Sequence, residues 1–595
     1  MPYRFKASWK SVIIIALALF VTVACLCLFG RTVRADDEFA ASGKGWTLTQ
    51  DGVLTITDNS AFDAKDWEQS ETAVTSLVIS GDITSIPDKA FNENETLTDV
   101  NLGKVTSIGY YSFSSCSALT YIDLSKVTYI DSFAFNSCTS LAAVDISNVV
   151  SLQNHAFSDC TSLTAVIADD LETIGYNAFS GCPKLSIFVF KQASKVTCIG
   201  SDAFYGCEKL TSLDLSKVTS VTGSAFYNCF SLSDLKLGKV TSVGDHAFYR
   251  CTALTHIDLS NVTSVEDSAF IGCKNLVDVV SLANANQIGS RAFANCFSLS
   301  TELDLRKIDA IEQYSFCECR SLTKAILSDA NDVVIGYGAF SNCKELRTVS
   351  GRISEVDDGA FSGCNELADI DLSHVTSIGQ AAFVSCRQLK SVDLSNAQSL
   401  KSSAFKDCRE LTTVLLGDEI ALIPSNVFES CNNLQTINLD KITKVGYNAF
   451  YKCESLKTAD LSNAIALSSR AFTGAGVKTV TLGPALESIG RECFSSNLET
   501  VYFIGSRSQN KCEASLENAT VIYSAFDVVF DTGSECTEVI DPQIVEKDSR
   551  AVKPSSDPKL AGSVFTGWYT DEECKNAYDF GQPVKENITL YAGWK

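Results

Sequence analysis

Hydrophobic and polar positions follow a short pattern that recurs along most of the chain. In residues 131–146, DSFAFNSCTSLAAVDI, the second Phe, the Cys and the Leu are each three residues apart, the spacing of one face of a helical turn. Val144 and Ile146 then flank the polar Asp145, an alternation typical of a half-buried strand. One copy is therefore predicted to be a helical turn that leads into a short strand.

Copies of this pattern follow one another at a nearly constant step. The Phe recurs 19 times, most often every 22 residues, at Phe91, Phe113, Phe135, Phe157, Phe179, Phe204, Phe226, Phe248, Phe270, Phe293, Phe316, Phe340, Phe361, Phe383, Phe405, Phe428, Phe450, Phe472 and Phe494. A repeat of this length, with a Leu-x-x-Ile-x-Leu core, is the signature of a leucine-rich repeat solenoid, in which each unit packs only on its neighbours.

The predicted fold class is an α/β repeat: a solenoid of about 19 units of ~22 residues with one parallel sheet and short helical turns opposite. Residues 81–505 form this solenoid, between an N-terminal β cap at 36–80 and a C-terminal cap at 506–525. Strand patterns around Trp568 and Trp594 then predict a small separate β domain at 526–595.

Residues 1–35 have the pattern of an export signal. Arg4, Lys6 and Lys10 precede an apolar run, and Val33-Arg34-Ala35 offers small residues at a cleavage site. An uncleaved anchor and lipidation at Cys25 are the alternatives. We therefore expect a secreted or extracellular protein. Association with the cell surface is the alternative. The formal net charge of −23 argues against nucleic acid and against an anionic membrane as partners.

Sixteen of the 24 cysteines occupy one position, three residues after the repeated Phe. They are Cys116, Cys138, Cys160, Cys182, Cys207, Cys229, Cys251, Cys273, Cys296, Cys319, Cys343, Cys364, Cys386, Cys408, Cys431 and Cys453. Parallel side chains in register keep their Cβ atoms roughly 4.8 Å apart, slightly too far for an unstrained disulfide. We therefore expect a ladder of free, packed thiols; disulfides and a metal site are the alternatives.

An Asp recurs on the solvent side of the predicted strand. It is present in eight units, as Asp123, Asp145, Asp214, Asp258, Asp304, Asp371, Asp393 and Asp460, and Tyr121 and His256 stand at a flanking outward position. One interpretation is an acidic sheet face that binds a basic partner or calcium. The other is that each Asp bonds its own backbone at the strand end, as Asp-Leu-Ser sequences do in turns. Adjacent units carry the Asp only at 123/145 and 371/393.

No catalytic motif is recognised. The four His do not form a metal-binding or nucleophile-activating pattern, and the acids are spread along the repeat. We expect no catalysis, no cofactor and no metal. The predicted function is protein–protein binding or adhesion through the acidic sheet face, with an extracellular or host-surface protein as partner. The alternatives are a spacer without a ligand and a hydrolase with a dispersed carboxylate site.

Two resemblances support this picture. The Phe-x-x-Cys-x-x-Leu unit resembles the BspA-like leucine-rich repeats of bacterial and protist surface proteins. The C-terminal pattern Phe-x-Gly-Trp-Tyr…Tyr-Asp-Phe…Ile-Thr-Leu-Tyr-Ala-x-Trp resembles the Listeria–Bacteroides, or internalin-type B, repeat. These resemblances imply a surface or secreted protein involved in adhesion, with a β-grasp-like module at its C-terminal end.

Overall fold

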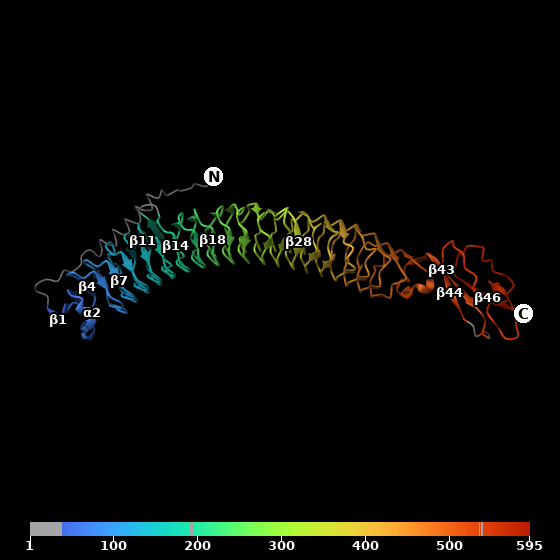
Figure 1. Ribbon diagram of the computed structural model, residues 1–595, viewed down its shortest axis with the longest axis horizontal. Coiled ribbons are helices and arrows are strands. Elements are labelled where there is room, and N and C mark those ends of the chain that lie inside the picture. Colours follow the sequence, from blue (N-terminus) through green and yellow to red (C-terminus); the bar gives the residue numbers. More distant parts are fainter. Residues whose placement is uncertain (1–37, 191–193, 535, 537–538) are drawn as a thin grey trace. The chain divides into compact units, whose positions relative to one another are not determined.

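The structure is a computed structural model that describes residues 38–190, 194–534, 536 and 539–595. The chain divides into two compact units, of which one ends at Gly351 and the other starts at Arg352. In both units the repeats are stacked coils whose strands pair in parallel (Figure 1). The predicted leucine-rich repeat solenoid is confirmed. The predicted signal peptide lies outside the described residues.

In the first unit, most coils have a strand on one side, which we call the strand face. Its strands are β4 (Ser76–Ile79), β6 (Asp99–Asn101), β9 (Ala143–Asp145), β11 (Ala165–Ala168), β13 (Ile187–Phe190), β15 (Ser212–Asp214), β17 (Asp234–Lys236), β19 (His256–Asp258), β21 (Asp278–Val280), β23 (Leu303–Asp304), β25 (Lys324–Ile326) and β27 (Thr348–Ser350). Equivalent residues lie opposite one another: Val144 pairs with Val166. Side chains of the same repeat position therefore form columns along the stack.

A second ladder of shorter strands runs along another side of the same coils. It comprises β5 (Ser85–Ile86), β7 (Ser107–Ile108), β8 (Tyr129–Ile130), β10 (Ser151–Leu152), β12 (Thr173–Ile174), β14 (Cys198–Ile199), β16 (Ser220–Val221), β18 (Ser242–Val243), β20 (Ser264–Val265), β22 (Gln287–Ile288), β24 (Ala310–Ile311) and β26 (Val333–Ile335). The sequence predicted one sheet. Most of these strands have two residues, of which only the second is buried, so no alternation was long enough to detect.

The turn around each repeated Phe is not a continuous helix. Ala134 and Cys138 donate their N–H groups three residues back, to Asp131 and Phe135, but Phe135 donates to Ala156 of the next coil at 2.8 Å. Residues two before and two after the Phe have positive φ, as at Phe133 (59°) and Ser137 (58°). Left-handed residues at this spacing interrupt a helix and send alternate N–H groups to the neighbouring coil. The spacing of three was therefore a sign of separate turns.

Stacked phenylalanine rings form the centre of the core. In the first unit consecutive rings from Phe91 to Phe340 lie 5.1–5.6 Å apart, and most are nearly parallel. The ladder thiols lie beside them. Fifteen of these thiols donate to the carbonyl oxygen of the Phe in the preceding coil, at Sγ–O distances of 3.1–3.3 Å. Each buried sulfur thus has a structural role as a small donor.

The N-terminal end of the core is covered by aromatic rings. Strands β1 (Phe39–Gly43), β2 (Trp46–Thr49) and β3 (Val53–Ile56) are followed by helix α2 (Ser60–Ala64) and the 3-10 turn η1 (Asp66–Gln69). Phe62 and Trp67 from these turns are buried, and the Trp67 ring stacks on Phe91 at 6.2 Å. Neither aromatic residue belongs to a repeat, so the hydrophobic pattern of the sequence does not reveal this cover.

The second unit is built from coils of the same kind. Its strand face has β29 (Asp369–Ile370), β31 (Ser391–Leu394), β33 (Thr413–Leu416), β35 (Thr436–Ile437), β37 (Thr458–Leu461), β39 (Thr479–Leu482), β41 (Thr500–Phe503) and β42 (Thr520–Tyr523). Its second ladder has β28 (Ile353–Val356), β30 (Ser377–Ile378), β32 (Ser399–Leu400), β34 (Leu422–Ile423), β36 (Lys444–Val445), β38 (Ala466–Leu467) and β40 (Ser488–Ile489). The 3-10 turns η2 (Arg507–Gln509) and η3 (Glu513–Ser515) precede β42, the last strand of this sheet.

A small four-stranded sheet ends the chain. Its order is β44 (Ile540–Glu546), β43 (Ala525–Asp531), β46 (Ile588–Trp594) and β45 (Phe565–Tyr569), with β43 and β46 parallel. Trp568 is buried in its core and Trp594 packs against that core, as predicted. Strand β44 contains Pro542. An edge strand tolerates a proline, and β44 pairs only with β43.

Candidate functional site

The eight candidate Asp residues share one place in the coil. Each follows an inward-facing residue of the strand face and stands where the strand turns away; Asp145, Asp214, Asp258 and Asp304 are the last residues of their strands. Asp123, Asp258, Asp371, Asp393 and Asp460 are exposed, and the other three are partly exposed. The position is therefore accessible from the strand face.

Every one of these carboxylates is bonded to its own turn. The Oδ1 atom accepts the backbone N–H of the residue two positions later, at 2.9–3.3 Å, in Asp123, Asp145, Asp214, Asp258, Asp304, Asp371, Asp393 and Asp460. This is an Asx turn, in which the side chain replaces a backbone acceptor. The local capping interpretation of the repeated Asp is thus correct for one oxygen of each carboxylate.

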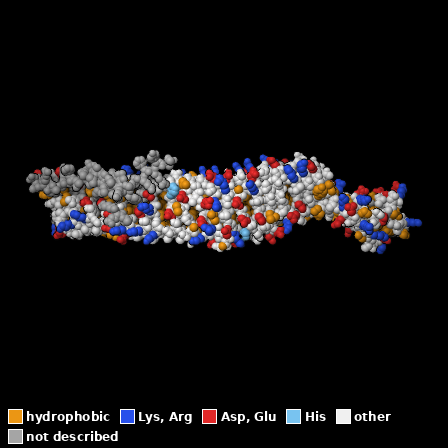
Figure 2. Space-filling model, turned by 90° about the horizontal axis from the view of Figure 1, so that it is seen from above, with side chains coloured by type: hydrophobic (Ala, Val, Ile, Leu, Met, Phe, Trp, Pro, Cys, Tyr) orange, Lys and Arg blue, Asp and Glu red, His pale blue; other side chains and the backbone are white. Residues whose placement is uncertain are grey.

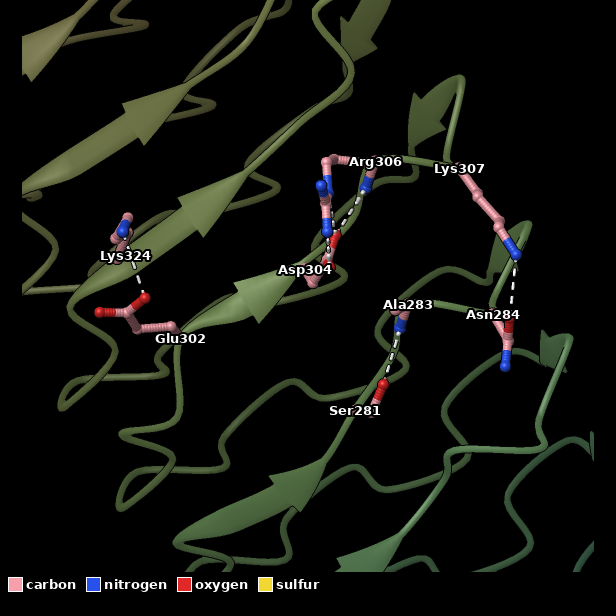
Figure 3. A network of polar contacts seen from close by, with 8 residues as sticks. All are labelled: Ser281, Ala283, Asn284, Glu302, Asp304, Arg306, Lys307 and Lys324. Atoms are coloured by element: carbon pink, nitrogen blue, oxygen red, sulfur yellow. Dashed lines mark hydrogen bonds and ion pairs between the residues drawn. The ribbon is translucent and has the colours of Figure 1, made fainter.

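The second carboxylate oxygen differs from coil to coil. Asp304 Oδ2 accepts from Arg306 Nη2 at 2.6 Å, and Asp214 Oδ2 accepts from Lys236 Nζ of the next coil at 3.3 Å. Figure 3 shows the Asp304–Arg306 pair beside a second ion pair, Lys324–Glu302. The hydrogen bonds from Arg306 hold the pKa of the Asp304 carboxyl below its ordinary value. Asp214 and Asp304 are therefore each paired with a basic side chain.

The Asp positions do not form a continuous acidic stripe. The residue opposite, in the next coil, is aliphatic for four of the eight: Ile167 faces Asp145, Val280 faces Asp258, Ile326 faces Asp304 and Leu415 faces Asp393. Figure 2 likewise shows acidic and basic side chains interspersed over the visible face of the coils. The strand face therefore presents short acidic patches separated by apolar residues.

The two other candidate residues lie in different settings. Tyr121 is partly exposed, in a segment of its coil that forms no regular strand. His256 is exposed on β19, where Nδ1 lies 2.9 Å from Thr255 Oγ1, and its register partner is Asp278. Asp258 extends from the same strand as His256. This arrangement gives an accessible polar patch.

Aromatic stacks on the turn side were not predicted. Tyr111, Phe133 and His155, from consecutive coils, stack with centroids 4.5 and 4.3 Å apart, and burial lowers the pKa of His155. A second stack joins Tyr205, Tyr227 and Tyr249. The signal was present in the sequence, because each stack uses one repeat position in successive units. Such stacking stabilises neighbouring coils.

The described residues contain neither a metal-binding cluster nor a helix that could span a membrane. Within the described ranges, no three His, Cys, Asp or Glu side chains are grouped so that they could hold a metal ion. In that same part of the chain, no helix is long and apolar enough to cross a bilayer.

Stacked coils with a parallel strand face, inward Leu and Ile, and an Asx turn after the strand define a leucine-rich repeat protein. The family model of the BspA type leucine rich repeat region matches residues 67–186, 172–300, 309–435 and 376–501. The chain belongs to this family. The model of the Listeria-Bacteroides repeat domain matches residues 526–593.

Solved structures of bacterial leucine-rich repeat proteins are similar to this chain at low identity. A leucine-rich repeat protein from Bacteroides ovatus is 17% identical, with 83% of this chain and 99% of that chain covered and a TM-score of 0.32. A leucine rich cell surface protein from Faecalibacterium prausnitzii is 21% identical, with coverage of 68% and 95% and a TM-score of 0.31. A search of curated proteins found no match.

Proposed function

We propose that this chain is an exported, non-enzymatic protein that acts outside the cell or at its surface and binds a protein partner through the strand face of its solenoid. Membership of the BspA-type family supports this proposal, since leucine-rich repeat proteins bind other proteins and this type is typical of surface proteins. The C-terminal Listeria-Bacteroides repeat, also typical of bacterial surface proteins, supports the same location.

The observation that carries the proposal is the fixed geometry of the strand face. Each Asp carboxylate is held by the N–H of its own turn, and the strands beneath it are held in parallel register. A surface that is already ordered loses little conformational entropy on binding. A partner therefore meets carboxylates, such as those of Asp258 and Asp393, at set positions beside the exposed aliphatic side chains of Val280 and Leu415.

The composition of the face indicates the chemistry of the partner. Short acidic patches beside apolar residues suit a protein surface that places Lys or Arg near aliphatic or aromatic side chains. The net charge of −23 accelerates the approach of such a partner at low ionic strength. We therefore expect a predominantly basic epitope on an extracellular or host-surface protein.

The test is a binding screen with the chain from residue 36 onward against extracellular-matrix and host-surface proteins. It is repeated with all eight repeated Asp residues of the strand face, which we call the Asp column, changed to Asn. The amide should preserve the fold: Asn101 occupies the same column and accepts the N–H of Gly103 at 3.0 Å. The matched control removes the same charge elsewhere, by Glu→Gln at eight exposed positions, which are Glu95, Glu172, Glu312, Glu345, Glu366, Glu419, Glu487 and Glu517.

Loss of a specific partner in the Asn variant, with the partner retained by the Gln control, is the expected result. A partner that both variants retain would place the binding surface on the turns or on the C-terminal domain. If no member of the panel binds the unmodified chain, the proposal fails and the spacer function is favoured.

A further inference from the structure

The phenylalanine stack of the second unit ends without a covering ring. From Phe361 to Phe494 consecutive rings lie 4.9–5.9 Å apart, with angles of 3–20° between their planes. Phe494 stacks on Phe472 and, among the described residues, on no other ring. It is partly exposed, whereas Phe472 is fully buried. The last ring therefore has one unpartnered face.

The other end of the repeats is closed differently. There Phe91 contacts two aromatic side chains of the N-terminal cap: Trp67 stacks on it at 6.2 Å and Phe62 meets it edge-on at 6.2 Å. The cap that follows Phe494 contributes Ser515, Leu516 and Ala519 in place of a ring, and a cavity of about 390 Å³ remains. No residue from the coil of Phe472 lines this cavity, so it lies on the far side of Phe494.

The walls of this end cavity combine apolar side chains with polar groups, and one of these groups is cationic. Ile489, Leu498 and Leu516 line it together with Phe494, and Arg491 stands among them. A volume of this size falls within the range of about 300–1,000 Å³ that is typical of small-molecule sites. The cavity can therefore hold a planar ring in contact with Phe494.

The charged groups at the cavity leave Arg491 available to bind a ligand. Glu492 also lines the cavity, but its carboxylate accepts from Arg470 Nε of the preceding coil at 2.9 Å. Within the described residues, Arg491 forms no ion pair, and its side chain is exposed. Cys493, also at the cavity, does not add a negative charge, because burial raises the pKa of its thiol to about 12. The local balance favours an anionic group on the ligand.

We propose that the end cavity binds a small aromatic carboxylic acid. Its ring stacks on the free face of Phe494 and so continues the phenylalanine ladder by one position. Its carboxylate receives hydrogen bonds from the Arg491 guanidinium. This site uses neither the strand face nor a protein partner, so the failure of one proposal leaves the other standing.

The experiment measures binding of indole-3-acetate to the chain from residue 36 onward by calorimetry and ligand-observed NMR. Two other probes separate the contributions. Cyclohexaneacetate keeps the charge without an aromatic ring and should bind about threefold more weakly or worse. Indole-3-acetamide keeps the ring without the charge and should bind about tenfold more weakly.

Variants locate the site. Arg491→Gln should weaken indole-3-acetate binding about tenfold, whereas Lys511→Gln, an exposed change in the cap that does not line the cavity, should have no effect. Ala519→Phe should fill the cavity and abolish binding, whereas Ala485→Phe at an exposed position outside the cavity should not. Thermal unfolding verifies that each variant is folded.

Saturable binding that follows this order of probes and variants supports the proposal. It is overturned if indole-3-acetate shows no saturable binding, if cyclohexaneacetate binds as tightly, or if the folded Ala519→Phe and Arg491→Gln variants bind like the unmodified chain.

Discussion

Removing one ring from the middle of the phenylalanine stack should loosen the solenoid locally. Phe248 is fully buried and stacks on Phe226 at 5.4 Å and on Phe270 at 5.1 Å. A Phe→Ala change in a core costs about 3–5 kcal/mol, and two lost aromatic contacts place this site at the upper end of that range. We therefore expect Phe248→Ala to destabilise its coil by about 5 kcal/mol. Since about 1.4 kcal/mol is a factor of ten, this corresponds to more than a thousandfold in the local opening equilibrium.

Hydrogen exchange is the suitable assay because each coil packs only on its neighbours. The amides of Phe226 and Phe248, which donate to Ala247 and Ala269 of the following coils, should exchange much faster. The amide of Phe135, five coils from Phe248, should change little. Phe248→Leu is the control: it keeps most of the volume and should cost about 1–1.5 kcal/mol. An acceleration below tenfold at Phe226 would refute the stacking argument, and an equal acceleration at Phe135 would refute its local character.

Three further predictions follow from buried thiols and turn contacts. Burial raises the pKa of the Cys273 thiol to about 12, so above pH 9 the unfolded chain loses this proton before the folded chain does. The free energy of unfolding should therefore fall between pH 9 and 12. Urea unfolding should show a shallower fall in Cys273→Ala. Asp371→Ala should cost about 0.5–1.5 kcal/mol in thermal or urea unfolding, because the N–H of Ser373 loses its acceptor; Asp371→Asn should cost little, and equal losses in both variants would contradict the capping role. In the folded chain, Cys198 should react with a maleimide well before the ladder thiols, since it is exposed and they are buried; mass spectrometry after brief labelling would reveal any other order.

The fold class could be predicted from the sequence because the repeat occurs in many copies, so an irregular unit does not hide the pattern. The inward Leu and Ile, the Phe column and the Cys column were each predicted from many copies, and nearly all of these residues are buried. The second ladder of strands was missed for the opposite reason. A strand such as Ser151–Leu152 has one buried residue, and no period can be detected in two positions.

Features that occur once were beyond the pattern. Trp67 covers the first ring of the stack, and Pro542 lies within an edge strand; neither position repeats. The end cavity at Phe494 exists because the C-terminal cap places no aromatic ring on Phe494, and the composition of the sequence does not reveal this. For the candidate site, the sequence located the Asp column. It did not decide whether these residues bind a partner or cap their own turns.

The hydrogen bonds of the Asp column change where specificity should be sought. A residue that recurs in many coils and makes the same bond in each, as Asp123 and Asp460 do, is explained by the folding of its own turn. Its recurrence therefore says little about a partner. The residues that differ between coils distinguish one part of the face from another: His256 where many other units have Ser or Thr, Lys236 and Leu415 where many others have Asp. We infer that the repeated acids supply an ordered, charged background, and that a partner selects its place on the solenoid by these exceptions. Changing His256 and Leu415 to the repeat residues should therefore weaken specific binding more than removal of any single column Asp.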